Sequence, residues 1–124
     1  MLGGAGVLAG IWALLPRYSG PALELGPRGD ELEFVDHVVP GVVVILVSAL
    51  AVVLARRYDV AAVLFPAGLG IVLAGFWMMA THVPLVLQAT RDQAPWGATI
   101  YHSSPGLAVL VLGVVWTKTW YSEA

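Results

Sequence analysis

Four long apolar segments constrain the fold of this chain more than any other feature. They cover about residues 2–18, 38–55, 60–80 and 105–121. A helix needs roughly 17–25 residues to cross the hydrocarbon core of a bilayer, so each segment is long enough, the first only just. Continuous apolar runs favour helices, because open strands in lipid would leave backbone groups unpaired. We therefore predict an all-α membrane protein, with four transmembrane helices in a single domain over residues 1–124.

Composition supports this prediction and excludes several functions. Hydrophobic residues make up 59% of the chain and charged residues 11%, whereas about a quarter of an ordinary soluble domain is charged. A soluble chain of 124 residues could not bury so much apolar side chain. The net charge of −2 lacks the clustered positive charge of a nucleic-acid-binding surface. The absence of cysteine excludes thiolate metal sites. The lipid bilayer is the expected partner, and nucleic acid is not.

The connections between the segments indicate the topology. The second connection, residues 56–59, is so short that the helices on either side must be antiparallel neighbours. The basic residues divide evenly between the two sides, with Arg56, Arg57 and Lys118 on one side and Arg17, Arg28 and Arg91 on the other. The first group stands beside helix ends in short segments. The positive-inside rule therefore favours a multi-pass protein with both termini in the cytoplasm.

An internal repeat is visible when the sequence is shifted by 65 residues. Residues 7–12 then align with residues 72–77, and the His-x-x-Pro-Gly element at His37 aligns with the one at His102. Two matches at one offset predict a tandem duplication of a two-helix unit, with units at about 1–59 and 66–124. Because each unit contains an even number of helices, the two units are expected to share one orientation in the membrane.

Small residues at helical spacing predict where the helices pack. Residues four apart lie on one helix face, and stripes of small residues let helix backbones approach closely in lipid. The predicted packing residues are Ala5, Ala9 and Gly10 in the first unit and Gly70, Ala74 and Gly75 in the second.

A small residue followed by Gly-x-Trp occurs in both units, at Ala9 to Trp12 and at Ala74 to Trp77, and a Pro-Gly pair follows later. Two-helix units of this length and pattern resemble the SPW-repeat family of membrane proteins. The Ser-Pro-Trp signature itself is absent, since Ala-Leu-Leu-Pro follows Trp12 and Met-Met-Ala-Thr follows Trp77. The resemblance implies an architecture and no catalytic residues.

The histidines are the sharpest candidates for a binding site. Proline suits the first turn of a helix, so His37 and His102 are expected just before the second helix of each unit, at equivalent depths, with His82 on the same side. Facing imidazoles could bind a b-type haem or, with a carboxylate such as Asp36, a divalent metal. They could also sense protons. Because these positions precede a helix, we expect the histidines to act as capping or hydrogen-bonding groups at the membrane interface. We therefore expect no cofactor, with haem b as the alternative.

The remaining motifs argue against catalysis and transport. The apolar segments contain essentially no charge of the kind that marks an ion path, and their most buried polar groups are Ser48, Thr81 and Thr117. No nucleophile elbow, zinc-protease motif or phosphate loop occurs. We therefore expect a non-enzymatic structural or accessory subunit that packs in a larger membrane assembly or as a homo-oligomer. The alternatives are a haem- or metal-binding electron-transfer subunit and a small channel or transporter.

Overall fold

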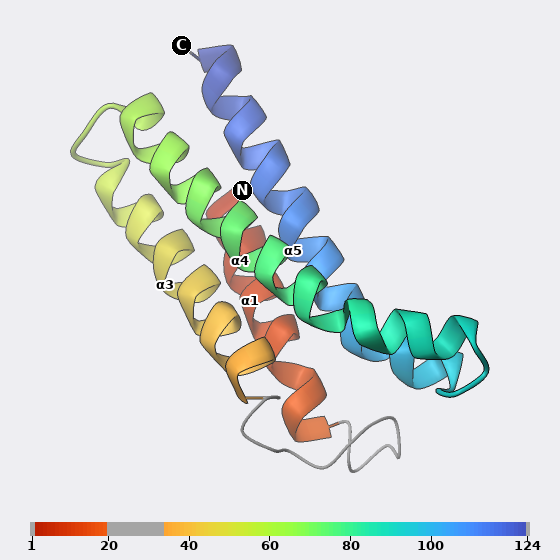
Figure 1. The fold of residues 1–124 in the computed structure, drawn as a ribbon. Coiled ribbons are helices and arrows are strands. Elements are labelled where there is room, and N and C mark those ends of the chain that lie inside the picture. Colours follow the sequence, from red (N-terminus) through yellow and green to blue (C-terminus); the bar gives the residue numbers. More distant parts are fainter. Residues whose placement is uncertain (1, 20–33, 124) are drawn as a thin grey trace.

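The computed structural model describes residues 2–19 and 34–123, and these residues are helical apart from two short connections (Figure 1). The elements in chain order are α1 (Leu2–Ser19), the π-helical turn η1 (Phe34–Val38), α3 (Val39–Leu54), α4 (Val60–Thr90) and α5 (Trp96–Glu123). Because η1 runs directly into α3, the described chain forms four helical rods. The prediction of an all-helical fold with four helices is confirmed.

Three of these rods are long and apolar enough to cross a membrane. They comprise Phe34–Leu54, Val60–Thr90 and Trp96–Thr119, whereas α1 contributes the shorter apolar stretch Gly3–Pro16. By length and composition, the chain is therefore a multi-pass helical membrane protein. A crossing by α1 and the cytoplasmic location of the termini stay predictions.

The rods pack as two hairpin-like pairs. Helix α1 lies against α3 and helix α4 against α5, and the pairs meet through less extensive contacts of α3 with α4 and of α1 with α5. Helices α1 and α4 run in one direction, and α3 and α5 run in the other (Figure 1). The start of α1, the turn between α3 and α4, and the end of α5 therefore share one end of the bundle. The start of α3 and the turn between α4 and α5 lie toward the other end.

Glycine allows a close approach within each pair. A Cβ atom on Gly10 would lie 2.6 Å from Cγ1 of Ile45 and 2.8 Å from the carbonyl oxygen of Gly41. A Cβ atom on Gly75 would collide with the backbone nitrogen of Leu110. Gly75 and Leu110 stand 65 positions after Gly10 and Ile45. Only glycine permits such contacts between helix backbones, which contribute to helix association in lipid.

The predicted packing residues have different environments. Gly10, Ala74 and Gly75 are buried, Ala9 and Gly70 are half-buried, and Ala5 is exposed. On α1 the buried small face is formed by Gly3, Gly6 and Gly10, which follow the helical repeat. Ala5, one position before Gly6, lies off this face.

The turn between α3 and α4 is short, as predicted, with Leu54 ending one helix and Val60 beginning the next. Asp59 caps α4, because its Oδ1 atom accepts hydrogen bonds from the backbone N–H groups of Ala61 at 2.8 Å and Ala62 at 3.4 Å. This side chain satisfies donors that a helix start otherwise leaves open.

The sequence suggests a third connection over about residues 81–104, in which the apolar residues 83–87 either lie at the membrane interface or extend the preceding helix. The structure has the extension, and the connection is much shorter than 81–104. Helix α4 continues to Thr90 and α5 begins at Trp96, so the turn between them spans residues 91–95. Asp92 provides the reversal with a φ of 57°. Pro105 consequently lies inside α5 rather than at its start, and His102 is also inside the helix. Only Pro40 stands in the first turn of its helix, α3, as predicted.

Candidate metal centre

The three histidines of the chain converge in the interior of the bundle. His37, His82 and His102 are only 1%, 7% and 3% exposed. Their ring centroids are 4.8 Å apart for His37 and His82, 5.5 Å for His37 and His102, and 6.4 Å for His82 and His102. One ring nitrogen from each lies within 4.8 Å of the others. We refer to these three residues as the histidine triad.

His37 reaches the triad from the π-helical turn η1, and Pro40 explains this local structure. Pro40 has no N–H to donate to the carbonyl of Asp36, and its ring would crowd that carbonyl in a regular α-helix. The turn before Pro40 is accordingly wider than an α-helical turn. π-Helical turns are rare in proteins, and those that occur are frequently found at functional sites.

His102 is placed by a second proline, Pro105, within α5. Pro105 cannot donate to the carbonyl of Tyr101, and the hydroxyl of Ser104 donates to that oxygen at 3.5 Å instead. The next residue, Gly106, brings α5 against α4, because a Cβ atom there would lie 2.9 Å from Cβ of Met78. Since Met78 is one turn before His82, this close contact sets His102 beside His82.

His82 is already oriented like a metal ligand. Its Nδ1 atom lies 2.6 Å from the carbonyl oxygen of Met78. A carbonyl only accepts hydrogen bonds, so Nδ1 carries the proton and Nε2 presents a lone pair. That Nε2 atom is 3.0 Å from Nε2 of His37, which therefore donates to it. A histidine ligand commonly donates its second ring nitrogen to a backbone carbonyl in this way.

The triad has the donor set of a transition-metal site. Imidazole nitrogens suit zinc, copper, iron and nickel, and three histidines with an open fourth position form a known zinc arrangement. Ligand nitrogens around tetrahedral zinc are about 3.3 Å apart for bond lengths of about 2.0–2.1 Å. The separation of 3.0 Å between His37 and His82 is close to this value, and the other ring nitrogens, which lie within 4.8 Å, would have to move closer for an ion to bind. No acidic residue belongs to the triad within the described ranges, and Asp36 is half-buried beside it in sequence.

A haem fits the triad less well than a single ion. Two axial imidazoles must stand on opposite faces of the macrocycle. The Nε2 atoms of His37 and His82 lie within hydrogen-bonding distance, and the ring of His82 stacks on that of His102 at an angle of 19°. These contacts leave no room for a porphyrin between the imidazoles.

The sequence singled out all three histidines but not their burial inside helices. A signal was present, since each histidine stands two or three residues before a proline: Pro40, Pro84 and Pro105. The comparisons with known proteins add no further guide, as no family model, curated protein or solved structure matches the chain. The chemistry of the site therefore follows from its own residues.

Proposed function

We propose that this protein is a membrane protein that binds a transition-metal ion of the zinc class at His37, His82 and His102. The observation that carries the proposal is the convergence of all the histidines of the chain at one buried point. They come from three separate elements, η1, α4 and α5. A metal ion would therefore connect the two helix pairs.

Hydrogen bonding within the triad is the competing explanation, and it leaves Nδ1 of His37 unsatisfied. When Nε2 of His37 donates to His82, Nδ1 of His37 is a buried acceptor, and no hydrogen bond to this atom is found within the described residues. The backbone group of Ala13 that interacts with the His37 ring is a carbonyl, which cannot donate to it. A buried polar atom without a partner costs about 1–3 kcal/mol. Metal coordination offsets such a cost, because bonds to the ion contribute directly to folding.

The charge of the ion favours a fourth, external ligand. Three neutral imidazoles leave a divalent ion with its full charge, and an uncompensated charge is costly in an apolar interior. Water, hydroxide or a small anion in the fourth position would complete a tetrahedron. The site is thus suited to bind a single ion rather than to conduct ions across the membrane.

We further propose that the bundle arose by the duplication that the sequence predicts, with the two-helix architecture of SPW-repeat proteins. Pairs of contacts 65 residues apart support it. Gly10 contacts Ile45 as Gly75 contacts Leu110. Gly41 contacts Leu14 as Gly106 contacts Met79, and Gly3 contacts Val52 as Gly68 contacts Thr117. A twofold relation of this kind would make His37 and His102 equivalent and explain why they meet.

The other candidate functions have weaker support. Leu8, Leu46 and Leu73 are examples of exposed apolar residues on the outer faces, and lipid covers such faces as well as a partner protein would. A structural or accessory subunit therefore stays a prediction. A channel or transporter needs polar groups that face a path. Thr81 and Thr117 instead donate to carbonyls of their own helices, at 3.0 Å and 2.8 Å. The hydroxyl of Ser48 has no hydrogen-bond partner within the described residues, but it is fully buried against Gly6 of α1 and faces no path.

Metal analysis of the purified full-length protein tests the proposal. The protein should carry an affinity tag without histidine and be equilibrated in detergent with Zn²⁺ and, separately, with Co²⁺ as a spectroscopic substitute. We expect one ion per chain, with a tetrahedral Co²⁺ spectrum. The substitutions His37→Ala, His82→Ala and His102→Ala should each weaken binding by at least about 100-fold, because each removes a ligand rather than an outer support.

Thr99→Val is the matched control for these variants. Thr99 is a buried polar residue near the start of α5, and its hydroxyl donates to the carbonyl of Pro95 rather than to the triad. This variant should bind one ion with the affinity of the unmodified chain. Equal and weak binding by the unmodified protein and the three histidine variants would refute the proposal.

A further inference from the structure

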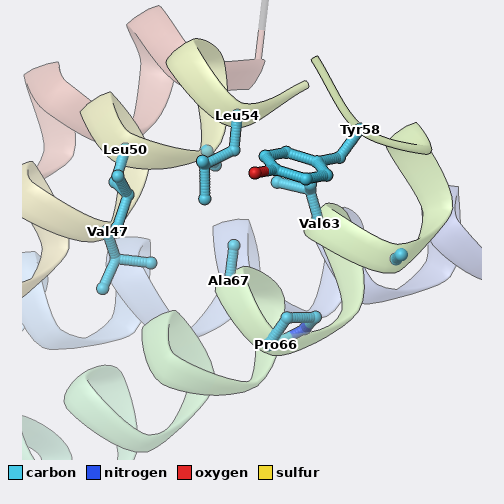
Figure 2. Close-up of a pocket in the computed structure, with 9 residues that line it drawn as sticks. Val47, Leu50, Leu54, Tyr58, Val63, Pro66 and Ala67 are labelled. Atoms are coloured by element: carbon cyan, nitrogen blue, oxygen red, sulfur yellow. The ribbon is translucent and has the colours of Figure 1, made fainter. Parts of the chain in front are cut away.

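An apolar groove lies between α3 and α4, beside the turn that joins them (Figure 2). His37 lies at the opposite end of α3. Its volume is about 430 Å³. Val47, Leu50 and Leu54 line it from α3, and Val63, Pro66 and Ala67 line it from α4. The ring of Tyr58, from the turn that joins the two helices, lies over Leu54 and Val63 (Figure 2).

The groove results from the way the two helix pairs meet. Helix α3 packs mainly on α1, and α4 packs mainly on α5, so the contact between α3 and α4 is less extensive. Small residues on the α4 side, such as Ala62 and Ala67, leave the space between the helices unfilled. A Cβ atom on Gly70 would lie 3.8 Å from both methyl carbons of Val47. This contact limits the separation of the two helices further along.

Two arginines lie in the turn that joins α3 and α4 at one end of the groove. Arg56 and Arg57 are exposed, and they lie in the chain between Leu54 and Tyr58, which both line the groove. Within residues 2–19 and 34–123, neither guanidinium forms an ion pair. The neighbouring acid, Asp59, binds the N-terminus of α4 instead. Two uncompensated positive charges therefore lie where an apolar groove reaches the end of the apolar helices.

We propose that this groove binds an anionic phospholipid, with one acyl chain between α3 and α4 and the phosphate at Arg56 and Arg57. The groove is apolar along its length, which suits a hydrocarbon chain and excludes a polar ligand. Guanidinium groups bind phosphate through paired hydrogen bonds. Tyrosine at the membrane interface commonly lies at the level of the headgroups. The proposal is independent of the metal site, since no histidine lines the groove.

Native mass spectrometry of the full-length protein tests this site. The probes are phosphatidylglycerol and phosphatidylcholine with identical acyl chains, added in equal amounts to protein in detergent. We expect one tightly retained phosphatidylglycerol, with a preference of roughly tenfold or more over phosphatidylcholine, because each basic residue near the surface favours anionic lipid. The double variant Arg56→Gln/Arg57→Gln should lose this preference.

Two further variants separate a site from a general effect of charge. Arg91→Gln removes an exposed arginine at the turn between α4 and α5, toward the other end of the bundle, and should keep the preference. Ala62→Phe places a ring in the groove from an exposed position and should abolish lipid retention while far-UV circular dichroism stays unchanged.

Equal retention of the two lipids by the unmodified protein would overturn the proposal. Retention unaffected by Ala62→Phe would do the same, and so would the appearance of dimers in place of lipid-bound monomers.

Discussion

The two helix pairs use the same kind of contact but differ in length and content. Helices α1 and α3 have 18 and 16 residues, whereas α4 and α5 have 31 and 28. The additional length of the second pair extends beyond the triad, as a hairpin that bends away from the bundle (Figure 1). The second pair also supplies two of the three histidines. The shared contacts form a scaffold, and the candidate site lies where the two pairs differ.

A second difference lies in the core. Ala51 in α3 and Trp116 in α5 stand 65 residues apart, and both are buried. The large ring of Trp116 is accommodated by Gly6 of α1, where a Cβ atom would lie 3.1 Å from the indole Cζ3 atom. The two pairs are therefore complementary to each other rather than interchangeable.

Replacing glycines at close contacts with the backbone of the neighbouring helix should produce the largest effect. Gly75→Ala should lower the free energy of unfolding by up to about 3 kcal/mol, because the new methyl group meets the backbone of Leu110, which cannot rotate away. Gly10→Ala should cost less, since part of its clash is with the side chain of Ile45. Thermal unfolding in detergent, followed by circular dichroism, measures both.

The control for this pair is Gly4→Ala, where a Cβ atom would meet nothing within 4 Å. Alanine is the better helix former, by about 0.5–1 kcal/mol, so this variant should be equal to or slightly more stable than the unmodified protein. A Gly75→Ala protein as stable as the Gly4→Ala protein would contradict the close packing of α4 on α5.

Metal binding should stabilise the contact between the two pairs by a similar amount. Zn²⁺ at 100 times its dissociation constant should raise the free energy of unfolding by about 2.7 kcal/mol, because only the folded chain assembles the triad. The increase should disappear at low pH, since protonated imidazole cannot bind the ion. Thermal unfolding with and without Zn²⁺ measures the effect. A similar increase in His37→Ala would show that the ion does not connect the pairs.

Loss of the helix cap in the turn between the two pairs should have the smallest effect. Asp59→Ala removes the acceptor for the backbone N–H groups of Ala61 and Ala62 and should cost about 1 kcal/mol. Asp59→Asn, which keeps an acceptor oxygen, should restore most of the stability. Unfolding measured as above distinguishes the two variants, and equal losses would indicate that the charge rather than the cap is important.

Much of the fold could be predicted, because the lengths of the apolar segments and of the connection at residues 56–59 can be read directly from the sequence. The four helices and the short turn before Val60 follow from these features. The extension of α4 is only one of two alternatives, because residues 83–87 are apolar but Pro84 suggests a helix end. The early start of α5 could not be predicted, because the residues after the turn are partly polar and Pro105 suggests a helix start. In the folded protein these prolines are tolerated, as the bond from Ser104 to Tyr101 illustrates.

The candidate site could be predicted only in part. The offset of 65 residues makes His37 and His102 counterparts, which suggests that they lie at one depth. No such argument places His82, because the residue 65 positions earlier is Arg17. The burial of His82 and its bond to the Met78 carbonyl depend on the packing of α4 against α5, which no local pattern specifies.

Cross-linking of paired cysteines tests the central claim most directly, namely that both helix pairs bring their histidines to the same end of one bundle. The chain contains no cysteine, so the double variant His37→Cys/His102→Cys introduces the only thiols. In native membranes, a short bismaleimide should join these thiols within one chain, whereas the pair His37→Cys/Lys118→Cys, at opposite ends, should stay unlinked. An absence of cross-linking in the first pair, or equal cross-linking in both, would contradict the arrangement.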